Sequence, residues 1–187
     1  MNSMRHNSRR GRSAVVGFTL SAIVVASLTL AGCADSVSTG TTLLTTKSST
    51  QLLMAEAASR VPAYMVVGEP SYDDLSEACG KEGENVEGLI RLWRSSATFS
   101  LKDNASIDPD TIIAEIVASF VDEGWVTTSS GGSTELTKSS VPTTLRFTAT
   151  PLETGTGGTL VVAARGACVP TDGPDSDEVV DLERSSR

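Results

Sequence analysis

The chain has 187 residues, with 15 lysines and arginines against 23 aspartates and glutamates. Its formal net charge of −8 disfavours binding to nucleic acid and electrostatic docking on anionic lipid head groups. Its one histidine, His6, lies near the N-terminus. The rest of the chain therefore cannot contain a site that uses an imidazole as base or metal ligand.

The first 32 residues have the three-part order of an export signal. Four arginines and no acidic residue lie between positions 5 and 12, and an apolar segment diluted by Ser, Thr and Gly follows over residues 14–31. The segment ends in Leu30-Ala31-Gly32-Cys33, which is similar to the lipobox of bacterial lipoproteins, where small residues precede the cysteine. Residues 1–32 are therefore predicted to be a lipoprotein signal peptide.

The lipobox resemblance implies that a diacylglyceryl group is attached to Sγ of Cys33 and that the chain is cut before this residue. Acyl chains, palmitate among them, would then anchor the protein on the extracytoplasmic face of the cell membrane. Cleavage removes 4 of the 15 basic residues and no acidic one, which leaves a net charge of −12. The alternatives are an uncleaved membrane helix and twin-arginine export. Ser8-Arg9-Arg10 hints at the latter, but the next three residues, Gly11-Arg12-Ser13, lack the apolar side chains that normally follow, which favours general secretion.

Two polar segments flank the predicted domain. Residues 33–50 are Cys33 and a stretch of mostly Ser, Thr and Gly, which predicts a flexible tether. Residues 170–187 contain six acidic side chains together with Gly and Pro, which predicts a disordered acidic tail. Residues 51–169 remain, a length typical of one small domain.

The first half of this domain gives mixed signals. Residues 51–61 are rich in Leu, Met and Ala and predict a helix that ends at Pro62. The stretch from there to Val86 is turn-rich and predicts no regular element. Residues 89–101 alternate apolar and polar side chains, which predicts a strand with Trp93 on its buried face.

The second predicted helix has the clearest signals in the chain. Asp108 suits the N-cap, Pro109 the first helical position and Gly124 the left-handed residue after the helix. Alternating segments separated by glycine turns follow and predict a β-meander. This order predicts an α+β two-layer sandwich with both helices on one face of an antiparallel sheet. The meander strands are expected over residues 125–129, 134–138, 143–150 and 159–169.

Two cysteines remain once Cys33 is assigned to the lipid. An even pair in an exported chain predicts a disulfide between Cys79 and Cys168. A redox-active pair is the alternative, but the C-x-x-C spacing that lowers a thiol pKa is missing. Cys168 has the strand parity of Leu160 and Val162, so the disulfide is expected on the helix side of the sheet.

The layout of the chain resembles the small envelope lipoproteins of actinobacteria. The residues that carry the resemblance are the lipobox, the Ser/Thr tether, one cysteine before a long strand, a helix ending DEGW and a last strand ending GACVP. The resemblance implies an extracytoplasmic, lipid-anchored protein of uncharacterised function. It assigns a role to Cys33 alone.

Catalytic motifs are missing from the sequence. Neither G-x-S-x-G, S-x-x-K nor G-x-x-x-x-G-K occurs, and no cofactor or metal is predicted. Neighbouring carboxylates such as Asp73 and Asp74 leave a carboxylate-dependent hydrolase as the weakest alternative. The sequence therefore favours a non-enzymatic interaction or accessory domain with a protein partner in the cell envelope.

Three arginines form the only candidate ligand site. Arg94, Arg146 and Arg165 are predicted to share the open face of the sheet, among Ser and Thr. Such a basic stripe could bind an anionic glycan or lipid head group, which gives a second candidate function. The competing interpretation pairs these arginines with acidic neighbours such as Glu135 on a solvated face.

Overall fold

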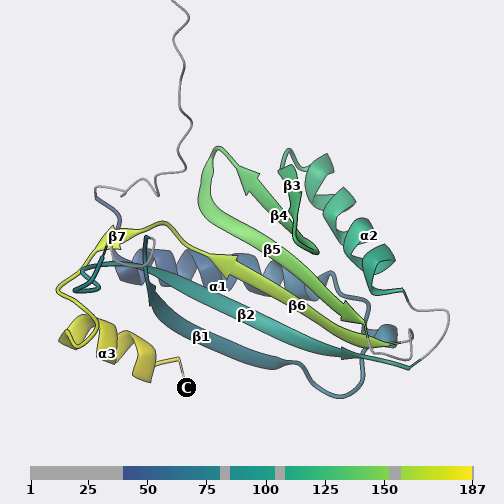
Figure 1. Ribbon diagram of the computed structural model, residues 1–187, viewed down its shortest axis with the longest axis horizontal. Coiled ribbons are helices and arrows are strands. Elements are labelled where there is room, and N and C mark those ends of the chain that lie inside the picture. The colour runs from purple at the N-terminus through teal and green to yellow at the C-terminus, as the bar shows by residue number, and fades with distance from the viewer. Residues whose placement is uncertain (1–39, 81–84, 104–107, 152–156, 187) are drawn as a thin grey trace, which may run out of the picture. The chain divides into compact units, whose positions relative to one another are not determined.

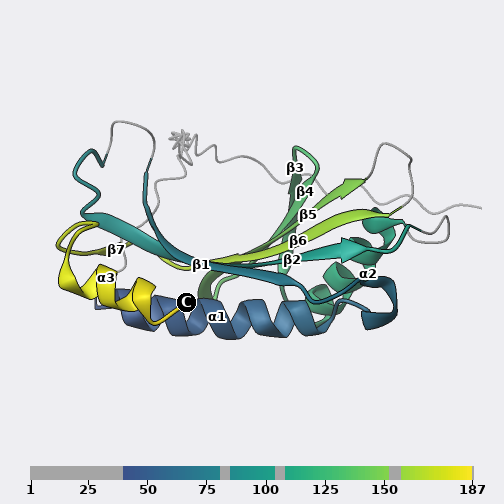
Figure 2. The ribbon, with the colours of Figure 1, turned by 90° about the horizontal axis from the view of Figure 1, so that it is seen from below.

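The computed structural model describes residues 40–80, 85–103, 108–151 and 157–186. The fold is α+β, as predicted, with helices packed on one face of an antiparallel sheet (Figures 1 and 2). The helices are α1 (Leu43–Ser59), the short 3-10 helix η1 (Ala63–Met65), α2 (Pro109–Asp122) and α3 (Asp177–Arg184). The strands are β1 (Ser71–Ala78), β2 (Ile90–Leu101), β3 (Val126–Ser130), β4 (Ser133–Lys138), β5 (Val141–Pro151), β6 (Gly158–Arg165) and β7 (Val169–Pro170).

The sheet has the strand order β1-β2-β6-β5-β4-β3, and β7 pairs with β2 where β6 has ended. All of these pairings are antiparallel, and β3 to β6 form the predicted meander. The long strand β2 therefore lies inside the sheet, while β1 and β3 are its two edges. The alternation along each strand separates a face covered by helices from an open face (Figure 2).

The covered face holds the main core. Trp93 is fully buried, as predicted, although it packs in a separate smaller cluster with Leu43, Val169 and Val179. The main cluster joins α1 and α2 to the sheet, so both predicted helices lie on one face. Its largest side chains come from α2, from the turn after it and from the central strands: Ile112, Ile116, Phe120, Trp125, Phe99, Leu145, Phe147 and Leu160.

The helix α1 begins eight residues before residue 51, so the predicted tether is too long at its C-terminal end. The hydroxyl of Thr42 accepts from the N–H of Thr45 and caps the helix. Within the helix, Thr46 donates to the carbonyl of Leu43 and Thr50 to that of Thr46, which satisfies their hydroxyls. Because these polar groups are already bonded, α1 can bury them against the sheet. Cys33 and the first part of the tether lie outside the described residues.

A glycine lets this part of α1 approach the sheet. A Cβ atom on Gly166 would lie 2.9 Å from Oγ1 of Thr50 and 3.0 Å from Cβ of Thr46. The N–H of Gly166 donates to the carbonyl of Trp93, which fixes the chain where β6 ends. The polar half of α1 therefore packs on the sheet only because the residue beneath it has no side chain.

The turn-rich stretch before residue 86 contains a strand that the sequence did not predict. β1 pairs with β2 along its whole length, from Ser71 opposite Thr98 to Ala78 opposite Arg91. Strand-type alternation is weak here because Asp73, Asp74 and Glu77 interrupt it. Main-chain pairing with β2 and side-chain bonds to residues of β2 stabilise this edge strand, because few of the β1 side chains are buried.

The helix α2 follows its prediction closely. Asp108 is the N-cap, Pro109 is the first helical residue and Gly124 has a φ of +88° immediately after the C-cap. The hydroxyl of Thr111 and the N–H of Asp110 donate to the carboxylate of Asp108, and these two bonds lower its pKa. The helix begins and ends where local signals placed it.

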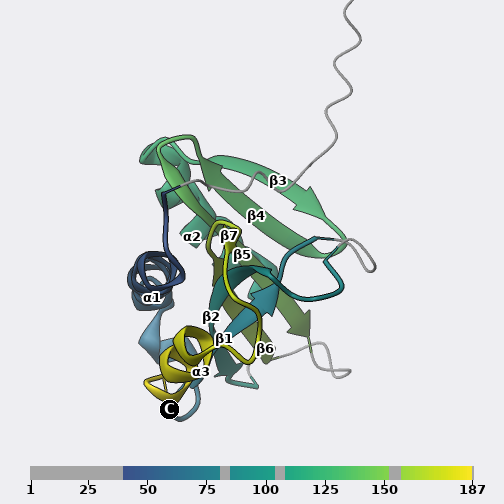
Figure 3. The same ribbon diagram turned by 90° about the vertical axis from the view of Figure 1, so that its left-hand side faces the viewer.

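The acidic C-terminal segment is folded, in contrast to the predicted disordered tail. Ser176 caps α3, Val179 is buried beside Trp93, and Glu183 accepts from the N–H of Ser76 in β1. Leu182 packs against the same cluster whereas Val180 is exposed, and α3 packs next to α1 at one end of the sheet (Figure 3). The domain therefore runs from α1 to α3 instead of over residues 51–169. No helix in the described ranges is long and apolar enough to cross a membrane.

Candidate functional site

The three predicted arginines do share the open face of the sheet. Arg94 of β2 is directly opposite Arg165 of β6, and Arg146 lies in the next strand, opposite Ala163. Arg146 and Arg165 have the opposite parity to the buried residues of their strands, and Arg94 has the opposite parity to the β2 residues that face the helices, Trp93, Ala97 and Phe99. The register therefore puts the three arginines on one face of three neighbouring strands, and their role as a ligand site stays a prediction.

Acidic neighbours accompany these arginines. Arg94 donates to Oδ2 of Asp73 at 2.9 Å, and its Nε lies 2.7 Å from Oε1 of Glu77 without hydrogen-bond alignment. The second carboxylate oxygen of Glu77 is 3.6 Å from Arg165. Glu77 of the edge strand β1 therefore lies near the guanidinium groups of both Arg94 and Arg165.

Arg146 is held in the same way at the other end of the stripe. Its Nε is 3.8 Å from Oε1 of Glu135, and its guanidinium donates twice to the hydroxyl of Ser133. Three guanidinium groups thus face three carboxylates, so the stripe carries no excess positive charge. An anionic ligand would have to displace these carboxylates, and its binding here stays a prediction.

The disulfide between Cys79 and Cys168 is confirmed. The sulfurs are 2.12 Å apart, and the distance of 6.0 Å between the Cα atoms is within the usual range for a disulfide. The cysteines pack with Leu92 and Ile90, which point to the open face of β2. The expected position on the helix side is wrong because β6 ends at Arg165 and the strand alternation does not continue to Cys168.

The neighbouring carboxylates Asp73 and Asp74 point to opposite faces of β1. Asp73 pairs with Arg94 on the open face, whereas Asp74 lies under α1, where it accepts from Nε1 of Trp93 at 2.7 Å. Asp74 also accepts from Ser95 and from Gln51, so its oxygens fix buried donors. These two carboxylates cannot act together on one substrate. Among the described residues, no three His, Cys, Asp or Glu side chains lie close enough to share a metal ion.

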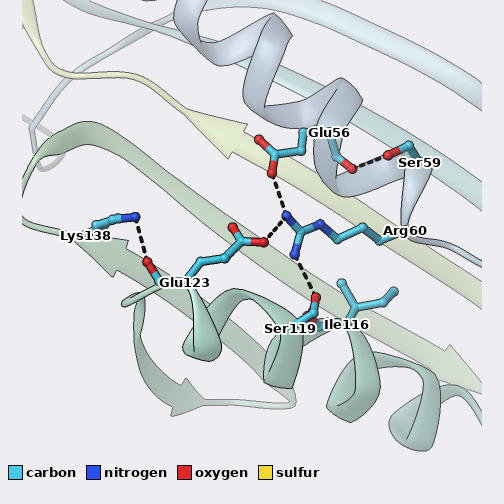
Figure 4. A network of polar contacts seen from close by, with 7 residues as sticks. All are labelled: Glu56, Ser59, Arg60, Ile116, Ser119, Glu123 and Lys138. Atoms are coloured by element: carbon cyan, nitrogen blue, oxygen red, sulfur yellow. Dashed lines mark hydrogen bonds and ion pairs between the residues drawn. The ribbon is translucent and has the colours of Figure 1, made fainter.

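The junction of α1 and α2 contains a second polar cluster, drawn in Figure 4. Arg60 donates to Glu56, Ser119 and Glu123 at 2.6 to 2.7 Å, and its guanidinium lies 3.7 Å from the ring centroid of Phe120. The donors of Arg60 are directed at partners within the protein. This cluster therefore joins the two helices, and a hollow of about 420 Å³ lies beside Arg60.

A larger groove separates α2 from the β3–β4 hairpin, with a volume of about 680 Å³. Its α2 wall is mainly apolar, and its opposite wall consists of hydroxyl and glycine residues of the hairpin. The carboxylates of Asp110 and Asp122 lie at the two ends of the α2 wall. The α2 wall is made by Ile113, Ala114, Val117, Ala118 and Val121, and the hairpin wall by Thr127, Ser129, Ser130, Gly131, Gly132, Ser133 and Thr134.

Sequence reasoning did not identify this groove. The signal that could have indicated it is the width of the apolar stripe on α2, which includes Val117 and Val121 beside the residues that reach the core. The second signal is β3 itself, VTTSS, an exposed strand without a charge. Neither signal gives the distance between the helix and the hairpin, which the packing alone sets.

No known protein family, curated protein or solved structure matches the chain. The candidate sites can therefore be judged only by the geometry of the protein itself. The open-face stripe is neutralised internally, and Cys33, whose lipidation was predicted, lies outside the described residues. The groove beside α2, of about 680 Å³, is larger than the hollow beside Arg60, of about 420 Å³.

Proposed function

We propose that this protein is a lipid-anchored, extracytoplasmic interaction domain of a bacterial cell envelope, without catalytic activity of its own. The disulfide between Cys79 and Cys168 carries the proposal, because such a bond persists in an oxidising compartment outside the cytoplasm. The basic, apolar and small-residue order that ends at Cys33 supports the same compartment.

The length of the chain between Cys33 and the domain suits this role. Nine residues separate Cys33 from Leu43, where α1 begins, and if they form the tether that their composition predicts, it would reach roughly 15 to 20 Å. The domain would then remain close to the lipid surface. Its net charge of −12 after cleavage opposes direct contact with anionic head groups, which favours a protein as its partner.

Replacement of Cys33 tests the anchor. The chain is expressed in a bacterium that processes lipoproteins, and the wild type and Cys33→Ala are compared by membrane fractionation and intact-mass measurement. The wild type should carry the mass of a diacylglyceryl group and lack residues 1–32, whereas Cys33→Ala should be an uncleaved precursor or a soluble form. Ser36→Ala, three residues away, is the control and should be processed normally. A Cys33→Ala chain that still acquires lipid would contradict the proposal.

Crosslinking of the anchored protein in living cells tests the interaction. The proposal expects one protein to be crosslinked to the wild type and much less of it to the unanchored Cys33→Ala form. Recovery of lipid or glycan alone, lost in a variant with Arg94, Arg146 and Arg165 changed to Gln, would instead support the open-face stripe as a ligand site.

A further inference from the structure

We propose that the outer edge of β3 and the groove beside α2 form a docking site for an extended peptide segment of a partner protein. The segment would pair with β3 as an additional strand, with apolar side chains toward α2 and a basic residue at each end. This inference rests on the proposed function for the compartment of the partner, and it specifies where and how that partner binds.

The two edges of the sheet differ in their protection. β1 carries Asp73, Asp74 and Glu77 and has α3 packed against it. β3 has neither a charged residue nor a proline, and all five of its residues are exposed. Charges and prolines are the usual means of preventing an edge strand from pairing with another chain. In the described part of the chain, no strand pairs with the outer side of β3, so its outward N–H and C=O groups are open to a partner strand.

The groove supplies a surface for the side chains of such a strand. Residues of an added strand would point alternately to the open face and to the covered face, where α2 lies. On the covered face they would contact the apolar wall of α2, where Val121 is 45% exposed and Ala114 and Ala118 are also exposed. An extended segment with an apolar residue at every second position therefore fits both walls.

The charges at the groove ends specify the ends of the segment. Asp110 and Asp122 are 12 positions apart on α2, about 18 Å along the helix axis. An extended strand of five or six residues covers about the same distance. Neither carboxylate has an ion-pair or side-chain hydrogen-bond partner elsewhere in the described ranges. A lysine or arginine at each end of the bound segment would complement them.

The same charges disfavour a second copy of this chain as the occupant. Pairing of two β3 edges would bring together the Asp110 and Asp122 carboxylates of both copies, and each copy is already strongly acidic. The hydroxyl-rich sequence of β3 also has a single apolar residue, Val126, whereas the α2 wall suits one at every second position.

Binding of designed peptides tests the proposal. The full-length processed protein is reconstituted in phosphatidylcholine nanodiscs and titrated with a fluorescent heptapeptide, KTVTVTK, with blocked termini, in which the valines and both lysines point to the same side of the strand. The peptide should bind saturably. KTVPPTK, in which two adjacent prolines remove an N–H that must face β3 in either register, and ETVTVTE, which has acidic ends, should each bind at least about tenfold more weakly. Absence of KTVTVTK binding, or equal binding of the three peptides, would overturn the proposal.

Groove variants locate the binding. Ala118→Trp fills the groove from an exposed position and should weaken KTVTVTK binding by at least about tenfold. Leu52→Trp, which adds the same side chain at a 74% exposed position of α1, should leave binding unchanged. Asp110→Asn combined with Asp122→Asn should weaken binding at low salt and remove most of its salt dependence.

Three further outcomes would also overturn the proposal. Equal effects of Ala118→Trp and Leu52→Trp would place the peptide elsewhere. A dimer in analytical ultracentrifugation that Ala118→Trp dissociates would assign the edge to a second copy. Competition by palmitate, lost in Ala118→Trp, would assign the groove to an acyl chain. If the purified chain lacks the mass of the lipid, the proposed anchor is refuted, but the peptide-binding result still stands.

Discussion

Nζ of Lys47 lies 2.6 Å from the main-chain oxygen of Leu182 and joins the first described helix to the last. The same ammonium donates to the hydroxyl of Ser185 and sits 4.8 Å from the ring centroid of Trp93. Lys47 is only 6% exposed. Its charge is therefore compensated by the last turn of α3, where helix carbonyls point, and by an aromatic face.

Replacement of Lys47 by Met should loosen α3. Met keeps most of the apolar stem but removes the donors, so we expect a loss of about 1.5 to 3 kcal/mol in the free energy of unfolding. Hydrogen exchange of residues 177–184 should become faster. Urea unfolding and exchange measure the two effects. Lys102→Met is the matched control, because Lys102 is exposed and donates to a single carbonyl; an equal loss in both variants would contradict this role of Lys47.

Asp74→Ala should destabilise the protein much more than Asp73→Ala. Removal of the Asp74 carboxylate leaves the indole N–H of Trp93 and the hydroxyl of Ser95 without this acceptor under α1, at a cost of about 2 to 3 kcal/mol. Asp73 pairs with Arg94 on the open face, where such a pair contributes less than about 1 kcal/mol. Urea denaturation compares these adjacent positions, and similar losses would indicate that the faces of β1 are assigned wrongly.

Loss of the disulfide should lower stability strongly. The bond closes a sequence separation of 89 residues, and the chain-entropy model gives about 4 to 5 kcal/mol for a loop of this length. Cys79→Ala combined with Cys168→Ala should therefore unfold at a much lower urea concentration than the wild type. The control is the wild type after reduction, which should match the double variant. An unchanged midpoint after reduction would contradict a stabilising role.

Asp108 should make the stability of the protein depend on pH in the acid range. Hydrogen bonds from Thr111 and Asp110 lower its pKa below the ordinary value of 3.8, so its carboxylate stabilises α2 above that pH. This contribution should decline as the pH falls through the lowered pKa. Asp108→Asn keeps an acceptor for the N-cap but cannot titrate, so its stability should vary less between pH 5 and pH 2.

The control for that measurement is the same substitution, Asp to Asn, at another position. Asp175→Asn removes one carboxylate in the loop before α3. If thermal unfolding midpoints of Asp108→Asn and Asp175→Asn change with pH to the same extent, the N-cap bonds do not account for the acid dependence.

The parts of the fold that the sequence predicted correctly are those specified by neighbouring residues. Asp108, Pro109 and Gly124 fixed the ends of α2 because capping groups act on amides within one turn. Alternation along β2 and the meander placed Trp93 and the three arginines on the right sides of the sheet, because side chains of a strand alternate strictly.

The missed elements depend on residues distant in the sequence. The polar start of α1 is stable because Gly166 lets it lie on the sheet, and α3 is held by Lys47 and by contact with Trp93. The edge strand β1 depends on its pairing with β2. Composition alone classed all three segments as tether, tail or turn, because composition contains no information about distant partners.

The sequence by itself determined the α+β class, the second helix, the meander and the pairing of Cys79 with Cys168. Only the tertiary structure decided that the arginine stripe is neutral and that Asp73 and Asp74 face apart, because both depend on the register between strands. It also decided that α2 stands away from β3 and leaves a groove of about 680 Å³. Helix-to-sheet distances result from the packing of the whole core, which no local pattern encodes.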